Sequence, residues 1–513
     1  MLTARMTLDP AFRVAPVNRR TFGTFVEHLG RCVYTGIYEP DHPSADDDGF
    51  RADVLELTKE LGVSTVRYPG GNFVSGYRWE DGIGPVESRP ARLDLAWHSL
   101  EPNHVGIDEF VRWARKADVE PMMAVNLGTR GLQEALDLLE YCNIPSGTRL
   151  SDLRIANGAK DPYGITMWCL GNEMDGPWQI GHKTAREYGR LAAEVARAMR
   201  MVDRNLELVA CGSSSSSMPT FGAWEATVLE EAYEHVDYIS CHAYYEERDG
   251  DLGSFLASAT DMDHFIASVV ATADHVGARL RSRKKINISF DEWNIWYMSR
   301  HVAYGGPSDW SVAPQLLEDR YHLADAVALG GLLISLLRHS DRVTAACLAQ
   351  LVNVIAPIVT EPGGRAWRQT TFHPFAQASR YAAGEVLRVE PVCPVYETAA
   401  YGEVPVLDAV ATRDEETGET TIFMINRSVD QSLTVDVDVR ALGAVKPGGR
   451  SGSVGRGGAV EATVLADSDP YARNTADDPL RVVPRANPEV RVEGGTVTVV
   501  LPPVSWNVIR LHV

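Results

Sequence analysis

Two acidic residues stand where apolar stretches of the sequence stop abruptly. Residues 166–173 begin as an apolar run and end in Asn172 and Glu173, and residues 286–292 follow the same pattern and end in Glu292. Short apolar runs are typical of strands that are buried on both faces. A carboxyl group at the end of such a strand would lie at the rim of a sheet, where α/β proteins bind ligands. Asn172 and Glu173 could instead form a turn that only exposes polar groups to water. The matching strand end at Glu292 disfavours this alternative.

Two carboxyl groups in this arrangement could divide the work of glycoside hydrolysis. One must carry a proton for the leaving oxygen, and the other must be ionised to attack the sugar or to activate water. A separation of about 5–5.5 Å would indicate a covalent intermediate and retention of configuration, and a wider one would indicate inversion. The sequence therefore predicts Glu173 and Glu292 as a catalytic pair.

Further polar groups at predicted strand ends could bind sugar hydroxyls. They are amides, a carboxyl, an imidazole and a phenol: Glu27, Asn72, Asn126, Asn172, His242, Tyr244, Gln350 and Asn353. Arg67 could keep Glu292 ionised by lowering its pKa, and Tyr244 could donate a hydrogen bond to the same carboxylate. Each signal is weak by itself. His242 could be a satisfied core histidine, and buried amides could serve only backbone groups.

Other chemistries find less support. Trp97, Trp178 and Trp296 follow predicted strands and could stack on a sugar face, or could simply pack beneath loops. The chain has no H-x-x-x-H and no clustered Cys/His spacing, so we expect no metal and no cofactor. The serine run 213–217 lacks a G-x-S-x-G frame, so it is predicted to be a flexible loop and not to hold a nucleophile.

The elements that would position these groups alternate between strands and helices as far as residue 383. The candidate strands are 21–27, 63–68, 121–126, 166–173, 206–211, 236–242, 286–292 and 345–352. The candidate helices are 51–61, 107–117, 132–142, 184–202, 223–235, 254–280, 315–338 and 375–383. Eight strands alternating with helices predict a (β/α)8 TIM barrel. A doubly wound sheet is the alternative, but the first strand is not followed by a Gly-rich phosphate turn.

Beyond residue 384 the helical spacing disappears. Short alternating strands are predicted at 406–411, 420–426, 432–439, 459–464, 496–501 and 508–513, and residues 448–458 are predicted to be a loop. This pattern is typical of a jelly-roll-like β-sandwich. The N-terminal arm, 1–18, is predicted to add one strand to it. The expected division is therefore a catalytic barrel, 19–383, and a sandwich domain formed by 1–18 and 384–513.

The composition limits the partners. With 513 residues, 45% hydrophobic and 23% charged, the chain is globular and too long for one ordinary core. A formal net charge of −20 argues against nucleic acid or an anionic membrane as partner. The seven cysteines are scattered and form no C-x-x-C pair, which indicates free thiols in a reducing compartment. No signal-peptide core and no run of 18 apolar residues is visible, so a cytoplasmic location is expected.

Five stretches, taken in order, carry a resemblance to a known family. They are FGTFVEHLGR (22–31), VRYPGGNF (66–73), CLGNEMDGPW (169–178), FDEWN (290–294) and AQLVNVI (349–355). The Gly-Asn-Glu and Asp-Glu-Trp motifs resemble those of the (β/α)8 retaining glycosidases. More narrowly, the five stretches resemble the α-L-arabinofuranosidases of glycoside hydrolase family 51, and the resemblance covers nearly the whole chain.

The resemblance implies an exo-acting, retaining enzyme that removes terminal α-L-arabinofuranosyl groups from arabino- and arabinoxylo-oligosaccharides. It implies Glu173 as the general acid and then base, Glu292 as the nucleophile, and Asn172 as a partner of the sugar 2-hydroxyl. Hydroxyl binding, support of the nucleophile and lining of the site would fall to Glu27, Asn72, Gln350, Tyr244, Arg67, His242, Trp97 and Trp296. It also implies a homo-oligomer, a hexamer or a trimer.

Two rival functions stay open at this point. One is an enzyme with the same carboxylates and another glycone, such as a galactofuranosidase, a β-xylosidase or an endoglucanase. The other is a catalytically silent carbohydrate-binding protein on the same fold, which the presence of both Glu173 and Glu292 disfavours.

Overall fold

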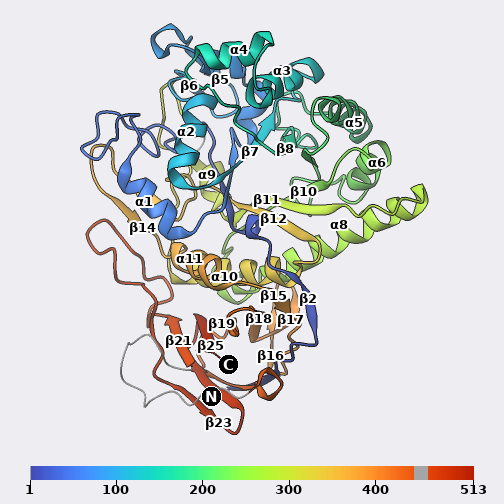
Figure 1. The fold of residues 1–513 in the computed structure, drawn as a ribbon. Helices are drawn as coiled ribbons and strands as arrows, with labels where there is room; N and C mark the ends of the chain where they lie inside the picture. Colours follow the sequence, from blue (N-terminus) through green and yellow to red (C-terminus); the bar gives the residue numbers. More distant parts are fainter. Residues whose placement is uncertain (1, 305, 444–459, 513) are drawn as a thin grey trace.

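The computed structural model describes residues 2–304, 306–443 and 460–512, and it contains a closed parallel barrel and a two-sheet β-structure (Figure 1). The barrel order is β10-β11-β12-β3-β4-β7-β8-β9. In chain order its strands are β3 (Gly23–Phe25), β4 (Thr65–Tyr68), β7 (Glu120–Val125), β8 (Met167–Leu170), β9 (Glu207–Ala210), β10 (Tyr238–Tyr245), β11 (Asn287–Ile295) and β12 (Val343–Leu348). The predicted (β/α)8 barrel is confirmed, with β8 as its fourth strand and β11 as its seventh.

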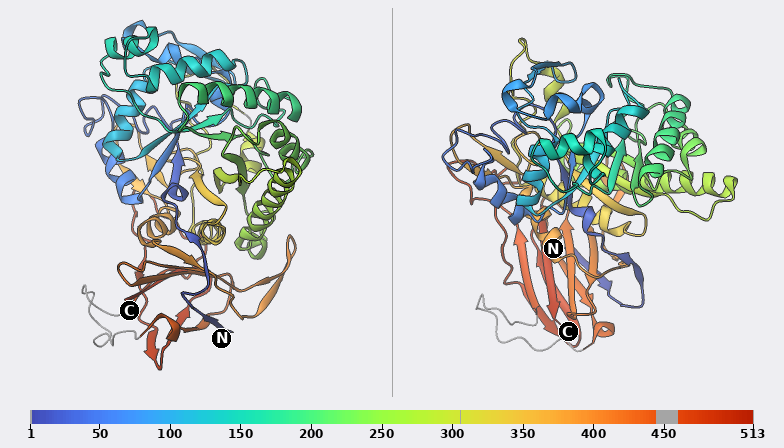
Figure 2. Two further views of the ribbon diagram at one scale, coloured as in Figure 1. Left: turned by 45° about the vertical axis from the view of Figure 1, so that its right-hand side comes forward. Right: turned by 45° about the horizontal axis from the view of Figure 1, so that its top comes forward.

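Helices surround the barrel (Figure 2). They are α1 (Ala52–Leu61), α2 (Ile107–Ala117), α3 (Leu132–Asn143), α4 (Arg149–Ala156), α5 (Ala185–Val202), α6 (Ala223–Ala232), α7 (Leu252–Leu256), α8 (Ala259–Leu280), α9 (Met298–Tyr304), α10 (Leu323–Arg338) and α11 (Phe372–Tyr381). The predicted helix 254–280 is two helices, α7 and α8, and the sequence pattern missed α4 and α9. None of the helices in the described ranges has the length and apolar character that a membrane crossing requires.

The predicted helix 315–338 begins eight residues too early. His322 is the N-cap of α10: its ring nitrogen accepts from the Asp325 amide, while the Asp325 carboxylate accepts from the His322 amide at 2.8 Å. This reciprocal arrangement satisfies amides that the first turn of a helix leaves free. The apolar spacing before it does not continue the helix, because the Asp319 carboxylate is held by the Tyr297 amide.

The C-terminal strands form two sheets that enclose one apolar core. One has the order β1-β20-β24-β23: β1 (Leu2–Thr7), β20 (Leu433–Asp438), β24 (Thr496–Leu501) and β23 (Val490–Glu493). The other has the order β2-β15-β18-β19-β25-β21-β22: β2 (Arg13–Pro16), β15 (Glu385–Leu387), β18 (Leu407–Arg413), β19 (Glu419–Asn426), β25 (Ser505–His512), β21 (Val460–Leu465) and β22 (Arg485–Ala486). The predicted sandwich is confirmed; the predicted loop at 448–458 lies outside the described residues.

The N-terminal arm contributes more than the single predicted strand. β1 pairs in parallel with β20 in one sheet, and β2 pairs antiparallel with β15 in the other. The prediction was wrong because Asp9 and Pro10 interrupt the arm, so its two halves enter different sheets. Three hairpins complete the fold: β5 (Arg92–Asp94) with β6 (Ser99–Glu101), β13 (Ile358–Thr360) with β14 (Ala366–Arg368), and β16 (Val395–Thr398) with β17 (Gly402–Pro405).

Candidate active site

Glu173 and Glu292 meet at the carboxyl end of the barrel. Glu173 lies three residues beyond β8 with a left-handed backbone (φ +45°), and Glu292 lies within β11. One carboxylate oxygen of each lies within 4.8 Å of the other. Both side chains are buried. The spacing is close to that of a pair acting through a covalent intermediate and leaves too little room for the wider gap of an inverting pair.

Glu292 is held by two donors from other strands. Arg67 on β4 donates from Nη1 to Oε1 at 2.9 Å, and the Tyr244 hydroxyl on β10 donates to Oε2 at 2.7 Å. Burial raises the pKa of Glu292 and the Glu173 carboxyl adds to the rise, whereas His242, Arg67 and Tyr244 oppose it. Glu292 therefore retains a proton more readily than an isolated carboxyl group would.

Glu173 has one donor on each oxygen. The ring Nδ1 of His242 lies 2.9 Å from Oε1, and the indole Nε1 of Trp178 donates to Oε2 at 2.8 Å. The Trp178 side chain remains 51% exposed, so its ring is open to a ligand while its N–H is fixed on the carboxyl. The sequence indicated Trp178 only as a ring that could stack on a sugar, and this hydrogen bond was not predicted.

His242 is a cation between carboxylates. Its Nε2 lies 2.9 Å from Asp291 Oδ1, opposite the contact of Nδ1 with Glu173. Burial alone would lower the pKa of His242, but Glu292, Asp291 and Glu173 together raise it to about 10. Glu173, His242 and Glu292 are close enough to offer ligand atoms to one ion.

The amides Asn172 and Asn72 extend this network. Arg67 Nη2 donates to Asn172 Oδ1 at 2.6 Å, and Asn172 Nδ2 donates to Asn72 Oδ1 at 3.3 Å. One arginine therefore orients Glu292 and Asn172 through the two prongs of its guanidinium. Asn72 begins the short helical turn Asn72–Gly76, which follows β4 after three residues.

Glu27 lies in a second cluster, at the end of β3. Its carboxylate accepts from the Phe73 amide at 2.9 Å, from Trp97 Nε1 at 2.8 Å and from Gln350 Nε2 at 3.0 Å. Burial raises the pKa of Glu27 to about 8, and the Glu292 charge adds to the rise. The Gln350 Oε1 atom is buried without a hydrogen-bond partner. Of the predicted tryptophans, Trp296 packs edge-on against Tyr244, with ring centroids 5.0 Å apart.

Two family models match the chain. The α-L-arabinofuranosidase 1 domain matches residues 57–265, and the α-L-arabinofuranosidase C-terminal domain matches residues 291–505. The chain is 61% identical, over 99% of its length and 75% of the relative's, to an intracellular exo-α-(1→5)-L-arabinofuranosidase of Streptomyces lividans. The chain belongs to the α-L-arabinofuranosidases of glycoside hydrolase family 51.

Two further relatives extend the comparison. An exo-α-(1→6)-L-arabinofuranosidase of Bifidobacterium longum is 56% identical over 99% of this chain and 97% of its own. The solved structure of a family 51 α-L-arabinofuranosidase from Bifidobacterium longum superposes with a TM-score of 0.93 at 50% identity, covering both chains fully. The protein is accordingly a glycoside hydrolase, and the family that the five sequence stretches indicated is confirmed.

Two of the weaker sequence candidates bind other parts of the chain. Asn126 donates to the Tyr77 carbonyl and accepts from the Gly128 amide, and Asn353 donates to the Arg31 carbonyl and to the Thr360 hydroxyl. The serine run is not a free loop, because Ser214 is buried and donates to Asp175 Oδ2 through both its amide and its hydroxyl. Asp175 and Asp291 were missed, since in the sequence each is one more acid beside a predicted catalytic glutamate.

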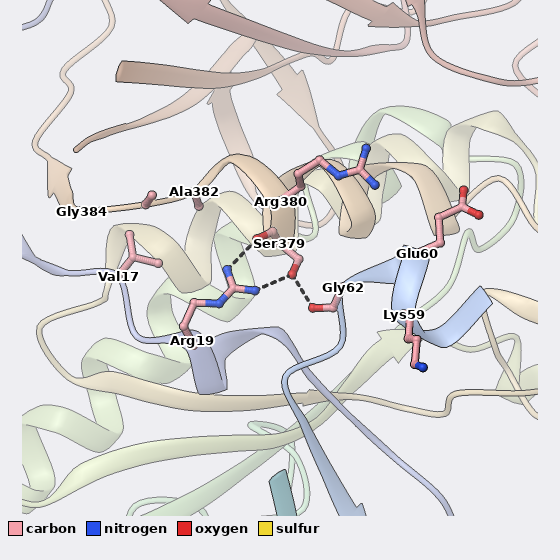
Figure 3. A pocket seen from close by; sticks show the side chains of 10 residues that line it. Val17, Arg19, Lys59, Glu60, Gly62, Ser379, Arg380, Ala382 and Gly384 are labelled. Atoms are coloured by element: carbon pink, nitrogen blue, oxygen red, sulfur yellow. Dashed lines mark hydrogen bonds between the residues drawn. The ribbon is translucent and has the colours of Figure 1, made fainter. Parts of the chain in front are cut away.

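Two surface cavities lie away from the arabinofuranosidase carboxylates. One, of about 430 Å³, lies at the opposite end of the barrel strands; there Arg19 donates to the carbonyl and hydroxyl oxygens of Ser379 (Figure 3). The other, of about 1070 Å³, is lined by residues of the sandwich such as Phe12 and Asp436. Neither contains a residue of the catalytic cluster, so the chemistry belongs to the carboxyl end of the barrel.

Proposed function

We propose that this protein is an exo-acting, retaining α-L-arabinofuranosidase. The observation that carries the proposal is the pair Glu173 and Glu292, with oxygens within 4.8 Å, in a family 51 chain. In the first step Glu292 attacks the anomeric carbon while Glu173 gives its proton to the leaving oxygen. In the second, Glu173 takes a proton from water, which attacks the same carbon and releases Glu292.

The donors around each carboxyl support this division of roles. Glu292 accepts from the Arg67 guanidinium and the Tyr244 hydroxyl, and both donors oppose the rise in its pKa that burial causes. In the proposed mechanism Glu173 is the group that gives a proton to the leaving oxygen. The Trp178 indole is anchored on Glu173 and remains half exposed, in a suitable place to contact the leaving group.

We propose that the remaining predicted residues bind the furanose. Asn172 takes the 2-hydroxyl, and Glu27, Asn72 and Gln350 take the other hydroxyls. The unpartnered Oε1 of Gln350 supports its part, because a buried acceptor without a partner is costly unless a ligand uses it. Trp97 and Trp296 line the site, with Trp97 anchored on Glu27.

The substrate and setting follow from the relatives. Their names specify exo action on α-(1→5) or α-(1→6) linkages, so we propose terminal arabinofuranosyl groups of arabino- and arabinoxylo-oligosaccharides as substrates. We propose an intracellular location on the same basis. We also propose a homo-oligomer, a hexamer or trimer, on the family resemblance alone, and a division into a barrel, 19–383, and a sandwich domain, 1–18 with 384–513. Light scattering would test the oligomer.

Two variants test the mechanism on a 4-nitrophenyl α-L-arabinofuranoside. Glu292→Ala should lose roughly 10⁴-fold or more of kcat/KM, because the nucleophile is gone. Glu173→Ala should still form the glycosyl-enzyme from this activated substrate, and added azide should restore turnover and give the arabinofuranosyl azide with retained configuration. Substantial activity of Glu292→Ala, or a product of inverted configuration, would contradict the proposal. Parallel assays on the galactofuranoside and xyloside would identify the glycone.

A further inference from the structure

β11, the strand that carries Glu292, has a local insertion of one residue relative to both adjacent strands, β10 and β12. Against β10, Ser289 pairs with Ser240 and Glu292 pairs with His242, so two residues of β11 stand opposite one of β10. Against β12, Phe290 pairs with Ala346 and Trp293 pairs with Leu348, so two residues of β11 again stand opposite one residue of the neighbouring strand. This is a β-bulge, a feature that re-aims side chains and is common next to active sites.

The bulge allows two consecutive carboxylates to serve one cluster. In a regular strand, adjacent side chains point to opposite faces. Here Asp291 and Glu292 have common partners: Asp291 Oδ1 lies 2.9 Å from His242 Nε2, and its Oδ2 lies 4.0 Å from Arg67 Nε. Glu292 accepts from the Nη1 of the same arginine and lies 3.6 Å from Nδ1 of the same histidine.

Asp291 is fully enclosed beneath the catalytic pair. It is 1% exposed, and its Oδ2 also accepts from the Ser289 hydroxyl at 3.3 Å and from the Cys169 thiol at 3.6 Å. Burial would raise the pKa of Asp291, but the charges of Arg67 and His242 and the hydrogen bonds from His242 and Cys169 bring it below its ordinary value. The ionised carboxylate therefore depends on these two cations.

We propose that Asp291 is a positioning residue of the hydrolytic reaction, which holds His242 as a cation with its Nδ1–H directed at Glu173. The imidazolium is thus fixed at one end by Asp291 and presented at the other to the acid/base. Asp291 itself touches neither the substrate nor the reacting carboxyl oxygens. Its part is to keep a positive charge beside Glu292, which attacks as a carboxylate, and beside Glu173, which gives up a proton and regains one in each turnover.

Titratable groups from several barrel strands and from the loop after β8 surround the Asp291–His242 pair. They are Arg67 on β4, Cys169 on β8, Cys211 directly after β9, Cys241 on β10, Glu292 on β11 and Cys347 on β12, with Glu173 and Asp175 on the loop after β8. Burial raises the pKa of all four thiols, so they remain neutral. Asp291 is therefore the carboxylate that compensates His242 from the side away from the substrate.

A nuclear magnetic resonance titration of labelled histidine tests directly whether His242 is held as a cation. The His242 signal, one of 14 histidines, is identified by its loss in His242→Gln. In the wild type this ring should remain doubly protonated at pH 8 and titrate near 10. A wild-type midpoint near the ordinary value of about 6.5 would overturn the proposal without any Asp291 variant.

The variant Asp291→Asn tests the consequence for catalysis. The His242 midpoint should fall by roughly 1–3 units. The kcat should fall roughly 10–100-fold with little change in KM, since a group behind the reacting residues is lost and not a substrate contact. An unchanged His242 midpoint, or a kcat close to that of the wild type, would overturn the proposal.

A matched control separates positioning from stability. Asp263 on α8 contacts an arginine and a histidine, as Asp291 does: Arg338 at 2.6 Å and His339 at 3.0 Å. Asp263→Asn should destabilise the fold but leave kcat and the His242 midpoint unchanged. The inference rests on the double displacement proposed above. The titration distinguishes a failure of the positioning role from a failure of the proposed double displacement, because it reports on His242 whichever sugar proves to be the substrate.

Discussion

Glu27 is a buried carboxyl group that accepts hydrogen bonds from three neutral donors among the described residues. They are the Phe73 amide, the Trp97 indole and the Gln350 amide. Burial raises its pKa from 4.5 to about 8. Between these values the folded chain holds a proton that the unfolded chain has lost, so the contribution of Glu27 to stability declines as the pH rises through this window.

We therefore expect Glu27→Gln to be more stable than the wild type at pH 8 and close to it at pH 5. The amide preserves the bonds from Phe73 and Trp97, and Gln350 can turn its free Oε1 towards the new NH₂ group. Urea unfolding at the two pH values measures the difference. The same variant should lose activity, because an ionisable hydroxyl acceptor is gone. A stability difference that is independent of pH would contradict this account of Glu27.

At the scale of elements, α10 packs against the sandwich through a glycine. A Cβ added at Gly330 would lie 2.5 Å from Cε3 of Trp506 on β25. The Trp506 ring is 1% exposed, stacks on Phe423 and donates from Nε1 to Gln377 of α11 at 2.9 Å. The indole is therefore fixed on several sides, and the close approach of helix to strand requires the missing side chain.

Gly330→Ala should lower the free energy of unfolding by about 1–3 kcal/mol. The clash with Trp506 outweighs the gain of roughly 1 kcal/mol that alanine gives within a helix. The matched control is Gly331→Ala on the same helix, where the nearest atom, Ile425 Cδ1, lies at 3.1 Å and belongs to a flexible side-chain end. Thermal unfolding of both variants tests this. Equal melting temperatures of the two variants would show that the Trp506 ring can move aside, and would contradict the prediction.

At the scale of the whole molecule, a chain of buried charges joins the barrel to the sandwich. Asp408 on β18 accepts from Arg338 on α10 and, at 2.5 Å, from Arg427, the residue after β19. Arg427 in turn donates to the Leu256 carbonyl of α7 at 3.2 Å. Breaking a buried ion pair by removing one partner is costly, since the other charge stays buried without compensation.

Asp408→Asn should therefore destabilise the protein by roughly 3 kcal/mol. The exposed pair of Arg13 with Glu415 provides the contrast, and Glu415→Gln should change stability by less than about 0.5 kcal/mol. Calorimetry of both variants measures the difference, with kcat at 25 °C as a check that the active site is intact. Similar melting temperatures for the two variants would refute this role of Asp408.

Much of this organisation can be predicted from local pattern. Strand number, the change from helical to alternating spacing near residue 384 and the polar groups at strand ends all depend on periodicity within a few residues. Because the strands of a barrel are parallel, all their carboxyl ends meet at one rim. Glu173, Glu292 and the nine predicted supporting residues could therefore be expected to gather there, although their individual roles remain proposals.

Tertiary structure decided what depends on register and on distant contacts. The residue count of β11 relative to β10 and β12 determines that Asp291 as well as Glu292 faces His242 and Arg67, and no single strand reveals a bulge. The division of the N-terminal arm between two sheets depends on β20 and β15, more than 350 residues away. The sequence by itself determined which carboxyls could react. The fold decided which neighbours hold them, because burial and charge are properties of the assembled barrel.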